Sequence, residues 1–395
     1  MRKKFSVIFI FLAFMFTISC LFGMSLNKAL AYSNNEVNSL KIESKSAYLI
    51  DANTKTVILS KNENEKLPIA SMCKIMTLLL CFDAINNKAI RLDDYVTVSD
   101  NASGMGGSQV FLESGAEYLV GELIKSIVVA SANDACVAMA EAISGSEDVF
   151  VEKMNKKAQE LNMDNTVFAN CTGLPKPTQY SCAKDVAIMF SELLKHDDYF
   201  KFSKIWTDKV MHPNDRFTEI SNTNKLIRFY NGCDSGKTGY TTEAGHCLSA
   251  SAVKNGMRLI SVVISAPDSK TRFAEASAMF NYGFANYVNK IVVDNNKPLD
   301  LNVKINGGKK DSIEVVAEES FFLFSKKDQK RGVELDFIPI DKIKAPIHIG
   351  DIVGKLNIYE NGILIGSINV LSNENVNNKT YFDIINDIST SWGVI

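Results

Sequence analysis

The amino-acid sequence predicts an α/β domain followed by a small all-β domain. Through much of residues 102–170, apolar residues recur every three to four positions, which is the period of amphipathic helices. Two strand-like runs flank the pair Asn255-Gly256, a strong signal for a tight β-hairpin. Beyond Ile291 the chain changes to short β-like runs separated by turns. We therefore place an α/β region at 38–291 and a β-rich region at 292–376.

The N-terminal residues resemble a secretory signal peptide. A basic start is followed by a long apolar run, and the small residues Ala29 to Ala31 provide a cleavage site, which assigns residues 1–31 to the signal. The alternative is an uncleaved anchor, because the apolar run is almost long enough to span a bilayer. The sequence thus predicts an exported protein.

The elements of the α/β region are predicted from local patterns. A hairpin turns at Asn53-Thr54, a helix follows Pro68, and a further helix is expected over residues 181–195. Two strands within 246–266 and a helix over 270–288 complete the region. At the chain end, 377–395, a stripe of Tyr381, Ile385, Ile388 and Trp392 predicts an amphipathic helix that could contact a membrane surface.

Composition excludes some functions. The formal charge of −2 and the absence of a dense Lys/Arg run argue against a nucleic-acid partner. The eight cysteines and four histidines are scattered without metal-ligand spacing, so we expect no metal and no cofactor. Most cysteines should be buried small hydrophobic residues.

The stretch KLPIASMCKIMTLLL contains a possible catalytic pair. Ser71 and Lys74 are three residues apart, so on a helix they share a face and the amine can reach the hydroxyl. A desolvated lysine with a lowered pKa could then take the serine proton. The same spacing also occurs at Ser181/Lys184 and Ser251/Lys254, so the pair alone is weak evidence.

Two further motifs strengthen the interpretation. Ser131-Ala132-Asn133 lies at an apparent connection between helices, and Lys237-Thr238-Gly239 occurs once, just before the predicted hairpin. A Ser-x-x-Lys, Ser-x-Asn and Lys-Thr-Gly series in this order is typical of penicillin-recognising serine enzymes. Together the three motifs are much more specific than any of them alone.

From about Ser46 to its end, the sequence resembles the low-molecular-mass penicillin-binding proteins that act as serine D-alanyl-D-alanine carboxypeptidases. The similarity includes LPIASMCKIMT, SANDACVAMAE, NTVFANCTGLP and DSGKTGYTTEAGHCLSASA. It implies a β-lactamase/transpeptidase-like domain, an antiparallel sheet with helices, followed by a β-rich domain. It also implies peptidoglycan stem peptides ending in D-Ala-D-Ala as substrates and β-lactams as inhibitors. The implied location is the outer face of the cytoplasmic membrane or the cell wall.

The resemblance also implies catalytic roles. Ser71 would be the nucleophile and Lys74 its proton acceptor. Ser131 would relay the proton to the leaving amine, and Asn133 would bind the substrate carbonyl. The backbone N–H groups of Ser71 and Tyr240 would form the oxyanion hole.

Substrate-binding roles follow from the same resemblance. Lys237 and Thr238 would meet the terminal carboxylate or steady the hydroxyl network, and Gly239 would let substrate lie close to the strand. Arg272 would help to hold the carboxylate. Structural roles are the alternatives: Ser131 could cap a helix, Asn133 could occupy a turn, and Arg272 could be a solvated charge.

Other features of the sequence have simpler interpretations, and other functions fit it less well. Cys73 and His246 are interpreted as structural residues, and Gly104 to Gly107 as a loop. A β-lactamase is disfavoured because Ala158 stands where its catalytic glutamate would be. A non-catalytic wall-binding or β-lactam-sensing protein is disfavoured because every named catalytic residue is present. An endopeptidase that cuts cross-links shares these motifs and remains an alternative.

Overall fold

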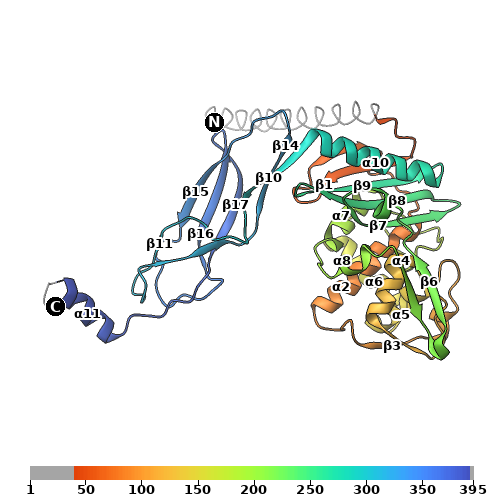
Figure 1. The fold of residues 1–395 in the computed structure, drawn as a ribbon, viewed down its shortest axis with the longest axis horizontal. Helices are drawn as coiled ribbons and strands as arrows, with labels where there is room; N and C mark the ends of the chain where they lie inside the picture. The colour runs from red at the N-terminus through yellow and green to blue at the C-terminus, as the bar shows by residue number, and fades with distance from the viewer. Residues whose placement is uncertain (1–39, 392–395) are drawn as a thin grey trace, which may run out of the picture. The chain divides into compact units, whose positions relative to one another are not determined.

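The computed structural model describes residues 40–391, which form two compact units that divide between Ala285 and Asn286 (Figure 1). The predicted signal peptide and Trp392 lie outside the described residues. The division falls shortly before the boundary placed on composition, because strand β10, Tyr287–Val293, pairs within the second unit.

The first unit is built around a five-stranded antiparallel sheet of order β2-β1-β9-β8-β7. Its central hairpin turns through Asn255 and Gly256, with φ of 51° and 77°, which is the backbone that this pair favours. The predicted fold class is therefore confirmed. The strands are β1 Ser46–Asp51, β2 Val57–Lys61, β7 Cys233–Thr241, β8 Gly245–Lys254 and β9 Met257–Ala266.

Both faces of the sheet are covered (Figure 1). On β9, Ile260 and Val262 join the core of the helical layer, while the alternate residue Leu259 faces helix α10, Ser269–Asn286. A Cβ built on Gly283 of α10 would lie only 2.5 Å from the Leu259 Cδ1 atom, so this helix packs closely on the strand. Burial on both faces explains why these strands are continuously apolar rather than alternating.

The helical layer carries the largest core. Its principal helices are α2 Lys74–Asn86, α4 Val120–Ala130, α5 Asn133–Ser144, α6 Glu147–Glu160 and α7 Ala183–Leu193. Residues 102–170 are less continuously helical than predicted, because a glycine-containing loop separates α3, Asp100–Ser103, from β4, Glu117–Leu119. Shorter elements that the sequence analysis did not place are β3 Tyr95–Thr97, β5 Thr207–Met211, β6 Phe217–Ser221, α8 Tyr199–Ser203 and α9 Leu226–Phe229.

The second unit is β-rich, as predicted, and has its own apolar core. A four-stranded antiparallel sheet of order β13-β17-β16-β15 is accompanied by two strand pairs, β10-β14 and β11-β12. The strands are β11 Val303–Lys304, β12 Ser312–Ile313, β13 Val315–Ala317, β14 Phe321–Lys326, β15 Glu334–Pro339, β16 Ile352–Glu360 and β17 Ile363–Ser372. Helix α11, Tyr381–Ser391, follows this unit. Within residues 40–391, no helix is long and apolar enough to cross a membrane.

Candidate active site

Ser71 and Lys74 meet where a short 3-10 helix, η1 Ala70–Cys73, continues into α2. The Lys74 Nζ atom donates to the Ser71 Oγ atom at 3.1 Å, so the predicted pair is formed. Lys74 also donates to the Asn133 Oδ1 atom at 2.6 Å and to the Thr172 backbone oxygen. An ammonium group has three N–H donors. All three therefore have acceptors, which holds this fully buried amine against the serine hydroxyl.

Two glycines allow other chain segments to press against η1. A Cβ built on Gly173 would lie 2.1 Å from the Ala70 oxygen, and its φ of +82° also disfavours other residues. A Cβ on Gly239 would lie 2.6 Å from the Ile69 oxygen and 3.2 Å from the Ser71 nitrogen. Strand β7 therefore passes directly beside the backbone N–H of Ser71, which only a residue without a side chain permits.

A second serine-lysine pair faces the first. Ser131 joins α4 to α5 in a left-handed conformation, with φ 63° and ψ 32°. Its Oγ atom accepts a hydrogen bond of 2.7 Å from Lys237 Nζ, which comes from β7. Burial, with the positive charges of Lys74 and Arg272 nearby, lowers the pKa of Lys237 well below its ordinary value. A proton on this group is therefore more easily lost than on a lysine in water.

The loop that contains Gly104 to Gly107 contributes to the site. The Asn133 Nδ2 atom donates to the Gly106 oxygen at 2.6 Å, and a Cβ on Gly107 would lie 2.8 Å from that nitrogen. Asp134, fully buried, accepts from the backbone N–H groups of Val110 and Leu112, each at 3.1 Å. The loop is thus fastened to the start of α5, which orients the Asn133 amide toward Lys74.

Sequence reasoning did not select Thr172, Gly173, Gly106 or Asp134. Thr172 and Gly106 act through backbone oxygens, so their side chains give no signal. Two sequence features could have indicated these residues. Asp134 directly follows the Ser131-Ala132-Asn133 motif, and the Thr-Gly pair lies within NTVFANCTGLP.

The predicted substrate-binding residues lie along and behind β7. Thr238 is buried, whereas Tyr240 is 59% exposed and stacks on His246, with ring centroids 4.4 Å apart. Arg272, from α10, donates to the backbone oxygens of Gly239 at 3.1 Å and Cys247 at 3.2 Å. The guanidinium group therefore braces β7 against β8, and its contact with a carboxylate remains a prediction.

The cysteines serve packing. All seven in the described part of the chain are buried and free. Cys73 donates to the Asn170 oxygen at 3.3 Å, and burial raises the pKa of its thiol, which disfavours the nucleophilic thiolate. Its structural interpretation is confirmed. Among residues 40–391, no cluster of three or more His, Cys, Asp or Glu side chains could hold a metal.

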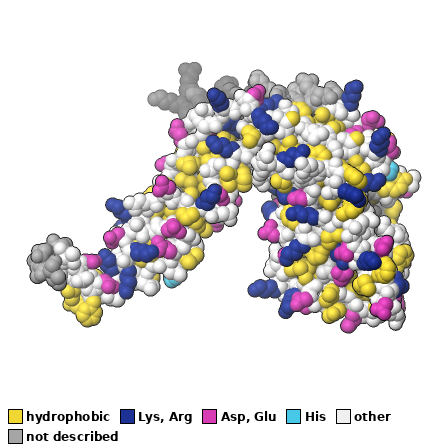
Figure 2. Space-filling view, viewed as in Figure 1, with side chains coloured by type: hydrophobic (Ala, Val, Ile, Leu, Met, Phe, Trp, Pro, Cys, Tyr) yellow, Lys and Arg dark blue, Asp and Glu magenta, His cyan; other side chains and the backbone are white. Residues whose placement is uncertain are grey.

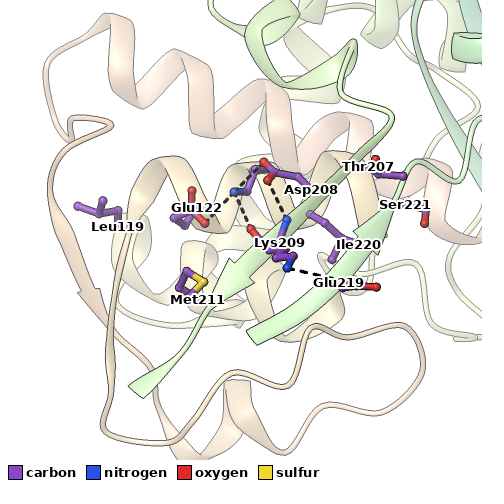
Figure 3. Close-up of a pocket in the computed structure, with 10 residues that line it drawn as sticks. Leu119, Glu122, Thr207, Asp208, Lys209, Met211, Glu219, Ile220 and Ser221 are labelled. Atoms are coloured by element: carbon purple, nitrogen blue, oxygen red, sulfur yellow. Dashed lines mark hydrogen bonds and ion pairs between the residues drawn. The ribbon is translucent and has the colours of Figure 1, made fainter. Parts of the chain in front are cut away.

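A second cavity, of about 930 Å³, lies between α4 and the β5-β6 hairpin (Figure 3). Lys125 is paired there with Glu122 at 2.9 Å and Asp208 at 3.0 Å. Burial lowers the pKa of Lys125, but the bonds to these carboxylates outweigh that effect and raise it above its ordinary value. Lys125 thus already has two carboxylate partners, and none of the predicted catalytic residues lines this cavity.

The Ser71–Lys74 pair, facing Ser131 and Lys237 in a largely buried setting, defines a serine enzyme of the acyl-transfer class. Comparison with known proteins identifies the family within that class. Residues 33–268 match the family described as D-alanyl-D-alanine carboxypeptidase, and residues 287–378 match the C-terminal domain of penicillin-binding protein 5. The chain therefore belongs to the D-alanyl-D-alanine carboxypeptidase family, serine hydrolases among the low-molecular-mass penicillin-binding proteins.

Individual relatives agree with this assignment. The chain is 41% identical to D-alanyl-D-alanine carboxypeptidase DacF of Bacillus subtilis (strain 168), over 90% of this chain and 91% of that protein. It is 31% identical to an Escherichia coli (strain K12) D-alanyl-D-alanine endopeptidase, over 60% and 76% of the two chains. The crystal structure of penicillin binding protein 5 from Haemophilus influenzae is 30% identical, with a TM-score of 0.67 over 85% and 98% of the two chains.

Proposed function

We propose that this protein removes the terminal D-alanine from peptidoglycan stem pentapeptides through an acyl-enzyme on Ser71. The observation that carries the proposal is the hydrogen bond between the Lys74 amine and the Ser71 hydroxyl, held by Asn133 and Thr172. In its neutral form, an amine held in this way accepts the hydrogen bond of the Ser71 hydroxyl and is placed to take the serine proton during attack on the substrate carbonyl.

The proposed chemistry has two steps. In the first, Ser71 Oγ bonds to the carbonyl carbon of the penultimate residue while Lys74 accepts its proton. The N–H groups of Ser71 and Tyr240 stabilise the oxyanion. The amide C–N bond then breaks, and the proton held by Lys74 is relayed through Ser131, which is hydrogen-bonded to Lys237, to the departing D-alanine amine. The relay returns Lys74 to its neutral form and leaves Ser131 protonated. In the second step, water hydrolyses the ester and restores Ser71.

The same site should react with β-lactams. Their strained amide takes the place of the substrate amide, so opening of the ring by Ser71 gives a comparable acyl-enzyme. Rapid hydrolysis of that ester is not expected, because Ala158, at the position of a β-lactamase glutamate, is a buried residue of α6.

Carboxylate recognition distinguishes a carboxypeptidase from an endopeptidase, the alternative that the Escherichia coli relative favours. The wild type should cleave diacetyl-Lys-D-Ala-D-Ala faster than its C-terminal amide. Each charge-assisted hydrogen bond to the carboxylate contributes about 1.5–3 kcal/mol, or roughly ten- to a hundredfold. Arg272→Ala should lower kcat/KM for the acid far more than for the amide.

The measurement is released D-alanine or D-alanine amide at matched substrate concentrations. Equal cleavage of acid and amide by the wild type would favour the endopeptidase. An equal loss on both substrates in Arg272→Ala would mean that Arg272 only braces β7 and β8, as its bonds to the Gly239 and Cys247 oxygens allow.

We further propose that the exported chain contacts the outer face of the cytoplasmic membrane through α11. Its apolar side chains gather on an exposed surface (Figure 2), and Phe382 is 80% exposed. Two cations lie beside α11, and both are paired with its carboxylates: Lys379 with Asp387 at 2.7 Å and Lys309 with Asp383 at 3.6 Å. Attraction to anionic lipid should therefore be weak, and apolar contact should dominate.

Liposome flotation should recover more of the full-length chain than of a chain ending at Val376. The difference should persist at high salt, because apolar burial is not screened. Equal flotation of the two chains would argue against membrane contact by α11.

A further inference from the structure

Another pocket, distinct from the second cavity, adjoins Ser71, and we call it the side pocket. It is about 430 Å³, within the usual range of ligand sites. Ile69 and Ala70, the two residues before Ser71, form one wall, and Thr241 and Glu243 lie at the end of β7. Leu174 and Tyr180 add apolar surface to the lining. The side pocket is therefore continuous with the candidate active site.

The direction of β7 relates the side pocket to the substrate. Lys237 and Thr238 are proposed to bind the terminal carboxylate, and Gly239 lies beside the Ser71 nitrogen. A strand advances about 3.3 Å per residue, so Thr241 lies roughly 10 Å beyond Thr238. An extended substrate reaches about the same distance in three residues. In a peptide bound along β7, the residue that precedes the D-Ala-D-Ala pair would therefore lie beside the side pocket.

The charged side chains that line the side pocket differ in whether they have an interaction partner. Lys66 lies over the Tyr180 ring, 5.0 Å from its centroid. In the described part of the chain, neither the Glu243 carboxylate nor the Lys176 ammonium has a side-chain hydrogen bond or an ion pair. Both are exposed, and both line the pocket. Glu243 is thus the one carboxylate that lines the pocket, and Lys176 is a cation there that neither a carboxylate nor an aromatic ring engages in the described residues.

We infer that the side pocket selects the side chain of this third residue from the peptide's C-terminus, and that it favours an aliphatic chain ending in both an ammonium and a carboxylate. The ammonium would pair with Glu243 and the carboxylate with Lys176, while the methylene groups lie against Leu174 and Tyr180. This inference rests on the proposed carboxypeptidase function and adds the substrate class that it prefers.

The test compares three N-acetylated peptides X-D-Ala-D-Ala on the full-length protein. X is diaminopimelate, with both charges, lysine, with the ammonium alone, or Nε-acetyl-lysine, with neither. We expect kcat/KM for D-alanine release to fall in that order, by roughly two- to fivefold at each step, because exposed ion pairs are screened by solvent. The steps should shrink as salt concentration rises.

Two variants test which residue recognises which charge of the substrate side chain. In Glu243→Gln, the ratio of kcat/KM for the lysine peptide to that for the Nε-acetyl-lysine peptide should fall to about one. In Lys176→Gln, the ratio of kcat/KM for the diaminopimelate peptide to that for the lysine peptide should fall to about one. The matched controls Glu219→Gln and Lys209→Gln, at the second cavity, should keep both ratios.

The outcomes separate the inference from the function on which it rests. If the wild type releases D-alanine equally from all three peptides, the inference is wrong and the carboxypeptidase stands. Ratios that survive both Gln variants would also overturn it, since the selection would then lie elsewhere. If no peptide releases D-alanine, the proposed function fails and the inference fails with it.

Discussion

Ser71→Ala should abolish both labelling by penicillin and release of D-alanine. Without the hydroxyl no ester can form, and loss of a serine nucleophile typically lowers kcat by about 10⁶-fold. Mass spectrometry of a digest of the labelled wild type should place the adduct on the peptide that contains Ser71. The variant should still fold, because Ser71 is only partly buried and its hydroxyl bonds to the Lys74 side chain, which has two further acceptors.

Ser221→Ala is the matched control, because Ser221 lines the second cavity and not the candidate active site. It should be labelled at the wild-type rate. A stable adduct on Ser71→Ala, or on a different serine of the wild type, would show that the nucleophile has been misassigned.

Lys74→Ala should reduce the rate of acylation by about 10²–10⁴-fold, the usual contribution of a general base. The variant keeps the Ser71 hydroxyl but removes the amine that accepts its proton. It also leaves the buried Asn133 Oδ1 atom without one donor, at a cost of about 1–3 kcal/mol in the free energy of unfolding. Stopped-flow acylation by a fluorescent penicillin measures the rate, and circular dichroism checks the fold.

Lys125→Ala provides the comparison, because Lys125 is also a buried lysine but pairs with Glu122 and Asp208 at the second cavity. It should lose stability without losing its acylation rate per folded molecule. Acylation of Lys74→Ala at the wild-type rate would assign the base to another group, and Lys237, with its lowered pKa, would be the next to test.

Sequence patterns predicted the features that depend on residues close together in the chain. Helical spacing placed Ser71 and Lys74 on one face, and the amine does reach the hydroxyl. Asn255-Gly256 predicted the central hairpin, because both residues accept positive φ. The change in composition predicted a second, β-rich region. The motif series then identified the type of chemistry without any knowledge of distances.

Long-range packing decided the rest of the candidate site. The Lys237 to Ser131 bond joins residues 106 positions apart, and the Lys74 to Thr172 bond joins residues 98 positions apart. No local pattern reports such contacts, and a backbone oxygen leaves no trace in the identity of its residue. The loop at Gly104 to Gly107 was for this reason recognised as a loop but not as a support of Asn133.

Sequence by itself determined the pairing of Ser71 with Lys74, the hairpin and the type of reaction, since each depends on residue identity and local geometry. Only the tertiary structure decided that Arg272 braces β7 against β8, and that Glu243 and Lys176 border a pocket beside Ser71. The physical reason is that burial and the pairing of charges depend on which distant segments pack together, and that packing is a property of the whole folded chain.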